Sequence, residues 1–74
     1  MELKEFVQIF SAAFEAPESI TSQTHYKDHK EWCSIVALTV MAVIRKRCKI
    51  TVKVEELRNC TTVEELYELI KQRQ

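Results

Sequence analysis

The sequence predicts an all-α protein, a small bundle of three main helices and one short helix with a long first loop. Glycine is absent from its 74 residues and Pro17 is the only proline, so the tight turns of β-hairpins are disfavoured. Apolar residues recur at helical spacing near both ends of the chain. A chain of this length is expected to form one domain, residues 1–74, with one modest core and no enclosed active site.

The first helix is expected over residues 3–14, where apolar residues recur at intervals of three and four. Glu2 and Glu5 suit the positive end of its dipole. Pro17 disfavours helical geometry at the preceding residue, so the helix should end near Ala16. The apolar positions are Leu3, Phe6, Val7, Phe10, Ala13 and Phe14.

A polar segment without sustained periodicity follows, over residues 17–33. It is interpreted as one long ordered loop. Such a segment stays compact only if some of its side chains are buried. Ile20 and Tyr26 are the expected anchors.

A central helix is expected to begin at Ser34, and Thr39 is the only polar residue from Ile35 to Ile44. A helix that is apolar on all sides is either buried or awaiting a partner, and ten residues are too few to span a bilayer, which takes about 20. We expect Leu38 at the centre of the bundle. The Ser34 hydroxyl either caps the helix or carries a phosphate ester, because a helix N-terminus favours an anion.

Beyond this helix, residues 50–54 alternate apolar and polar side chains without a second strand to pair with. They are interpreted as an extended connection to a short helix over residues 54–58. That helix should end near Asn59, a residue suited to a positive φ angle in a chain without glycine.

Thr62 and Glu65 form a capping box, each expected to accept the other's backbone N–H. It opens a last helix over residues 63–72, with Lys71 and Arg73 at its negative end. One apolar face is expected to be formed by Val63, Leu66, Tyr67 and Ile70.

The net charge of zero conceals a local excess of positive charge. Residues 34–53 carry five basic side chains and no acidic one, whereas the segments before and after contain more acids than bases. Bases in the last turn of a helix usually complement its dipole. We also expect them to recruit partners with an acidic surface. The five are Arg45, Lys46, Arg47, Lys49 and Lys53.

The three cysteines are an odd number, so free thiols in a reducing compartment, the cytoplasm, are expected. Cys48 and Cys60 are interpreted as small core residues. Cys33 has the position of a reactive thiol, and its spacing from His25 and His29 suits zinc. Neither a Cys-x-x-Cys pair nor a catalytic base accompanies these residues, so neither a metal site nor an enzyme is expected.

Over essentially its whole length the chain resembles the acyl carrier protein and peptidyl carrier domain family. In that family a long first loop leads into Asp-Ser-Leu at the start of the second helix, and the corresponding triplet here is Cys33-Ser34-Ile35. Tyr26 stands where the family usually has an aromatic anchor. Residues 60–66 are similar to the pattern that opens the family's last helix. Apolar positions shared with the family include Leu38 and Ile44.

The resemblance implies a carrier. A 4′-phosphopantetheine arm on Ser34 would hold an acyl or aminoacyl group as a thioester. Its partners would be a phosphopantetheinyl transferase and enzymes of fatty acid, polyketide or peptide biosynthesis. A monomer is expected, without nucleic acid or membrane as a partner. The residues expected to dock on partners are Trp32, Cys33, Ile35, Val36, Thr39, Arg45 and Lys46.

Two features favour other interpretations. Trp32 is equally suited to cover the central helix, and Ile35, Val36 and Thr39 are equally suited to the core. Cys33 replaces the acid that, in the family, helps the transferase hold magnesium, and a thiol is a poor ligand for that cation. The alternative function is therefore an unmodified carrier fold that serves as a structural or interaction module.

Overall fold

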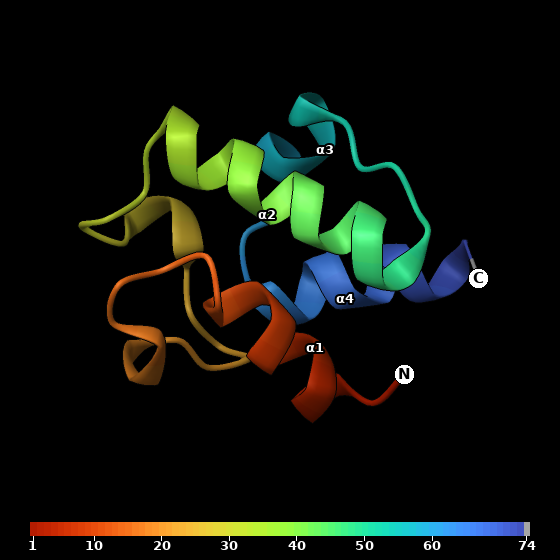
Figure 1. Ribbon diagram of the computed structural model, residues 1–74, viewed down its shortest axis with the longest axis horizontal. Helices are drawn as coiled ribbons and strands as arrows, with labels where there is room; N and C mark the ends of the chain where they lie inside the picture. The colour runs from red at the N-terminus through yellow and green to blue at the C-terminus, as the bar shows by residue number, and fades with distance from the viewer. Residues whose placement is uncertain (74) are drawn as a thin grey trace.

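The computed structural model describes residues 1–73 and contains four α-helices and no β-sheet in that range. In Figure 1, α2 runs across the molecule above α1, α3 lies at the top beside α2, and the N-terminus and the end of α4 lie on the right. The predicted bundle of three main helices, one short helix and a long first loop is confirmed. The helices are α1 (Leu3–Ser11), α2 (Ser34–Cys48), α3 (Val54–Asn59) and α4 (Val63–Gln72).

The core is built around a chain of aromatic side chains that begins in α1. Phe6 packs against Tyr67 of α4 with ring centroids 5.6 Å apart, and Phe10 meets the edge of Tyr26 at 5.3 Å. This face of α1 follows the predicted spacing, and the predicted apolar face of α4 is also buried. The fully buried side chains are Phe6, Phe10, Tyr26, Val40, Ile44, Val63, Leu66 and Ile70.

Helix α1 ends at Ser11, three residues before the predicted end. Beyond Ser11 the hydrogen bonds span three residues instead of four. The N–H of Phe14 donates to the carbonyl oxygen of Ser11 at 3.0 Å. The next N–H groups bond to a side chain of the first loop: the Glu31 carboxylate accepts from the N–H of Glu15 at 2.7 Å and of Ala16 at 3.2 Å. This competing acceptor lies 15 and 16 residues further on, so the local pattern could not reveal it.

The first loop is ordered as predicted, but it contains two short 3₁₀ turns, Pro17–Ser19 and Tyr26–Asp28. Ile20 and Tyr26 are both buried, which confirms them as anchors. The loop also bonds to the start of α4 through its backbone. The carbonyl oxygens of Thr24 and Ser22 accept from the N–H groups of Val63 at 3.3 Å and Glu64 at 3.0 Å.

Helix α2 ends at Cys48, and the next residue, Lys49, has a φ angle of 62°. The expectation that Asn59 would adopt a positive φ was wrong, because Asn59 is the last residue of α3. Because the chain has no glycine, Lys49 adopts the left-handed conformation that ends the hydrogen-bond pattern of α2. The extended connection that follows is confirmed, with Val52 buried.

The start of α4 carries the predicted cap in part. Thr62 Oγ1 accepts from the N–H of Glu65 at 3.2 Å. The Glu65 carboxylate accepts at 2.7 Å from the N–H of Thr61 instead of Thr62. Thr62 itself is extended beside His25 in an isolated bridge, so the reciprocal bond is displaced by one residue. The predicted bounds of the helix are nevertheless confirmed.

Candidate functional site

Ser34 is the first residue of α2, a helix of 15 residues, and its side chain is exposed. Cys33 precedes it in an extended conformation and occupies the cap position, where its side chain makes no capping hydrogen bond. The N–H groups of the first turn therefore lack a side-chain acceptor from that position. A phosphate ester on Ser34 would lie at the positive end of the α2 dipole, close to these donors.

The start of α2 is held on the core through Trp32. Its ring centroid lies 4.9 Å from that of Tyr26 and 6.4 Å from that of Phe14. The backbone N–H of Trp32 donates to the carbonyl oxygen of His29 at 2.9 Å. Trp32 is half-buried and packs against the core. It therefore anchors the chain two residues before Ser34.

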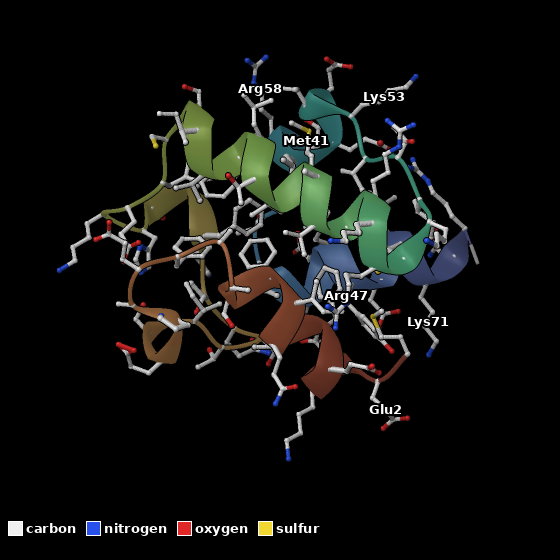
Figure 2. The ribbon with its side chains drawn as sticks, viewed as in Figure 1. Glu2, Met41, Arg47, Lys53, Arg58 and Lys71 are labelled. Atoms are coloured by element: carbon white, nitrogen blue, oxygen red, sulfur yellow. The ribbon has the colours of Figure 1, made fainter. Side chains whose placement is uncertain are left out.

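A hollow of about 370 Å³ opens beside Ser34, between α2 and α3. Its wall is mostly apolar, but two basic residues, Lys27 and Arg58, also line it. Lys27 Nζ donates a hydrogen bond to the carbonyl oxygen of Arg58. Figure 2 shows Arg58 extending outward at the top of the molecule. No residue pattern predicts this hollow, because it depends on how α3 lies along α2. The lining residues are Lys27, Trp32, Cys33, Ser34, Ala37, Leu38, Met41, Val54, Leu57 and Arg58.

The residues expected to dock on partners fall into two groups. Exposed side chains belong to Cys33, Ile35, Thr39, Arg45 and Lys46, whereas Trp32 and Val36 are half-buried against the core.

Leu38 was expected at the centre of the bundle, and this was wrong: 60% of its surface is exposed. Val40, Ile44 and Cys48 form the buried face of α2 instead. Because this helix is apolar on nearly all sides, its residue pattern does not indicate which face is turned inward.

Both histidines belong to the first loop and contact other residues of that loop. His29 Nδ1 accepts from the N–H of Glu31 at 3.1 Å, and His29 Nε2 lies 2.8 Å from Ser19 Oγ. His25 lies 4.0 Å from the Asp28 carboxylate. Residues 1–73 contain no cluster of three or more His, Cys, Asp or Glu side chains that could hold a metal ion.

All three thiols are free. Cys48 is buried, with Sγ 3.9 Å from the sulfur of Met1, and Cys60 is half-buried. Burial raises the pKa of both thiols, which favours the less reactive protonated form. Cys33 is exposed beside Ser34. Among the helices of residues 1–73, none has the length and apolar character needed to cross a membrane.

In the comparison with protein families, the model of the phosphopantetheine attachment site matches residues 34–70, which is half of the chain. The match begins at Ser34, the first residue of α2, and extends to Ile70 near the end of α4. No curated protein and no solved structure matched the chain.

Proposed function

Because this chain belongs to the phosphopantetheine attachment family, we propose that it is a carrier protein whose Ser34 bears a 4′-phosphopantetheine arm. The thiol of the arm supplies the linkage that holds an acyl or aminoacyl group as a thioester. Carrier domains are generally not catalytic themselves and interact with transferases and biosynthetic enzymes. The observation that carries the proposal is the exposed Ser34 hydroxyl at the start of α2, where the family match begins.

The chain's own residues account for the attachment. Ser34 Oγ supplies the oxygen of the phosphodiester. The N-terminus of α2 stabilises its negative charge. Trp32 keeps this end of the helix against Tyr26 and Phe14, so that the arm would pivot from a fixed point. Tethering of this kind raises the effective concentration of the cargo at each enzyme without tight binding.

The attachment reaction needs a phosphopantetheinyl transferase and coenzyme A. In it, a bond forms between Ser34 Oγ and the phosphorus that carries pantetheine, and the bond from that phosphorus to the bridging oxygen of the diphosphate breaks. Adenosine 3′,5′-bisphosphate leaves, and the serine proton passes to a base or to water. We also propose that the protein is a monomer and that it is located in the cytoplasm, where its thiols would stay reduced.

The test is intact-mass analysis after incubation with coenzyme A, magnesium and each of several broad-specificity transferases. We expect a gain of one phosphopantetheine group in the wild type and none in Ser34→Ala. Ser22→Ala, a change at a half-buried loop serine, is the matched control and should be modified like the wild type. No gain with any transferase would reject the carrier proposal, and a gain that persists in Ser34→Ala would move the site.

One observation favours a second function, an unmodified carrier fold that acts as an interaction module. Cys33 stands where the family's acid helps the transferase hold magnesium, and hard cations prefer oxygen ligands. If this second function is correct, the wild type will remain unmodified while Cys33→Asp gains the group in the same assay. Modification of the wild type would reject it.

A further inference from the structure

Helix α3 has only six residues, so its position depends on contacts with the rest of the fold. Helices this short are not stable in isolation. Leu57 is the one residue of α3 that is buried, whereas Val54 at its start is 39% exposed. Val54, Leu57 and Arg58 all line the hollow beside Ser34. The contacts that hold α3 in place therefore also set the width of that hollow.

The last turn of α3 is held from inside the molecule by the first loop. The hydroxyl of Tyr26, a fully buried residue, donates to the carbonyl oxygen of Leu57. Lys27 Nζ adds a hydrogen bond to the carbonyl oxygen of Arg58. Breaking the Tyr26 bond would leave a buried carbonyl oxygen without its donor, which is costly. This end of α3 is therefore firmly attached.

The first turn of α3 is held by a charged side chain from the end of α4. Arg73 Nη1 donates to Glu56 Oε1 at 3.1 Å, and Nη2 pairs with Oε2. Arg73 Nη1 also donates to the carbonyl oxygen of Thr51 at 3.2 Å. Glu56 Oε1 in turn accepts from the N–H of Lys53 at 2.8 Å. One guanidinium group thus joins the end of α4 to the start of α3 and to the connection before it.

The two attachments of α3 differ in their exposure to water. The side chains of Arg73 and Glu56 are 37% and 19% exposed, whereas Tyr26 is fully buried. Ion pairs in contact with solvent contribute little to stability and are weakened by salt. Figure 2 shows Lys53 and Arg58 at opposite ends of α3. The end of α3 next to Lys53 is therefore the one that opens at the lower cost.

We propose that the ion pair of Arg73 with Glu56 is a latch on the first turn of α3. When the latch breaks, this turn unwinds from Lys53 and Val54 withdraws from the hollow, while Tyr26 keeps the last turn in place. The hollow beside Ser34 then widens without unfolding of the core. Arg73 does not line the hollow itself, so it is a positioning residue that acts through α3.

The latch rests on the proposed carrier function only in one respect, namely that the widened hollow would receive part of the group carried on Ser34. The contacts that form the latch do not involve the arm. The test therefore uses the unmodified protein, and its outcome is independent of attachment at Ser34. Failure of the attachment assay and failure of the latch can thus be told apart.

The test is amide hydrogen exchange of the ¹⁵N-labelled protein. The N–H groups of Glu56 and Leu57 report on the first turn, because both donate to the carbonyl oxygen of Lys53, at 3.0 and 3.2 Å. The N–H of Cys60 reports on the last turn, because it donates to the carbonyl oxygen of Glu56 at 3.2 Å. Arg73→Gln should speed exchange at Glu56 and Leu57 about fivefold. Exchange at Cys60, and at Leu66 in the core, should change less than about twofold.

A second measurement follows the hollow directly. Cys33 is the exposed thiol and lines the same hollow as Val54. A nitroxide attached to Cys33 should broaden the amide signal of Val54 less in Arg73→Gln than in the wild type, because Val54 spends more time away from α2.

Lys71→Gln is the matched control, since it removes one positive charge from the exposed end of the same helix and should exchange like the wild type. Glu56→Gln keeps an acceptor for the N–H of Lys53 but removes the ion pair, so it should match Arg73→Gln. The double variant Glu56→Gln/Arg73→Gln should add no further increase. Added salt should speed exchange at Glu56 and Leu57 in the wild type but not in Arg73→Gln.

Four outcomes would overturn the latch. They are unchanged exchange in the first turn of α3, equal acceleration at Cys60 and Leu66, the same change in Lys71→Gln, and equal broadening of Val54 in the wild type and Arg73→Gln. Equal acceleration throughout would show that Arg73 only stabilises the whole fold. The salt series on the wild type needs no substitution, so it decides the question even if a variant fails to fold.

Discussion

The hydroxyl of Tyr26 donates a hydrogen bond to the carbonyl oxygen of Leu57, 2.5 Å away and 31 residues further along the chain. The carbonyl oxygen of Cys60 lies 3.2 Å from the same hydroxyl. Tyr26 is completely buried, so one side chain joins the first loop to the last turn of α3 and to Cys60, the residue that follows this helix. The same ring supports Trp32, which connects this contact to the start of α2.

Tyr26→Phe should therefore destabilise the fold by about 1 to 3 kcal/mol, because it leaves the buried carbonyl oxygen of Leu57 without its donor while keeping the aromatic ring. Chemical denaturation measures the change. Tyr67→Phe is the matched control. The Tyr67 hydroxyl donates to the carbonyl oxygen of Met1, an exposed residue, so water can replace the lost donor and the change should cost less. Equal losses in the two variants would contradict a special role for Tyr26.

Alkaline pH should destabilise the wild type more than Tyr26→Phe. The pKa of the Tyr26 hydroxyl is raised above its ordinary value of about 10, chiefly by burial and further by the negative charges of Cys60 and Glu65. A raised pKa means that the unfolded chain loses this proton first, so the contribution of Tyr26 is complete below pH about 10 and declines above it. Unfolding free energies measured for both proteins from neutral to alkaline pH test this, and parallel curves would exclude it.

Two substitutions in one helix separate its inner and outer faces. Ile44→Ala should cost about 2 to 5 kcal/mol, because Ile44 is fully buried, and that is a large part of the stability of so small a domain. Leu38→Ala should change stability by less than about 0.5 kcal/mol, as at other surface positions. Denaturation midpoints of the two variants give the comparison, and a similar loss for both would show that Leu38 is packed.

Substitutions at Cys33 can separate its effect on helix capping from its effect on magnesium binding during attachment. Asp and Ser are both favoured at a helix N-cap, so Cys33→Asp and Cys33→Ser should each stabilise the protein by about 1 kcal/mol. Only the carboxylate offers a good ligand for magnesium, so only Cys33→Asp should raise kcat/KM for attachment to Ser34, by about tenfold. Thermal unfolding and initial rates of modification are the measurements. A similar rate increase in Cys33→Ser would assign the effect to capping.

The sequence predicted well those elements whose signals are local. Thr62 and the apolar row of residues 63–72 gave the bounds of α4, and the spacing of the phenylalanines gave the buried face of α1. Anchors such as Tyr26 could be inferred from their apolar character in a polar loop, but their hydrogen-bond partners could not, because those lie tens of residues away.

The part of the site that the sequence did not predict lies on α2. Its residues are apolar around the whole helix, so the inward face depends on how α1 and α4 pack against it and not on periodicity. Leu38 was therefore misplaced, although Ser34 was correctly expected at the start of the helix. Arg47 shares a hollow with Glu5 of α1, whereas Lys46 lines a different one, and this separation likewise required the positions of neighbouring helices.

The backbone bonds between the first loop and α4 also imply an order of events during synthesis. Thr24 and Ser22 gain their N–H partners, and Tyr26 its carbonyl partners, only from residues translated after α2. A nascent chain that already contains Ser34 therefore lacks the hydrogen bonds that join its first loop to α3 and α4. The conformational entropy cost of ordering the loop is offset in full only when these later helices dock. We expect a chain truncated after residue 53 to be a poor transferase substrate, so that attachment would report a fully made and folded carrier.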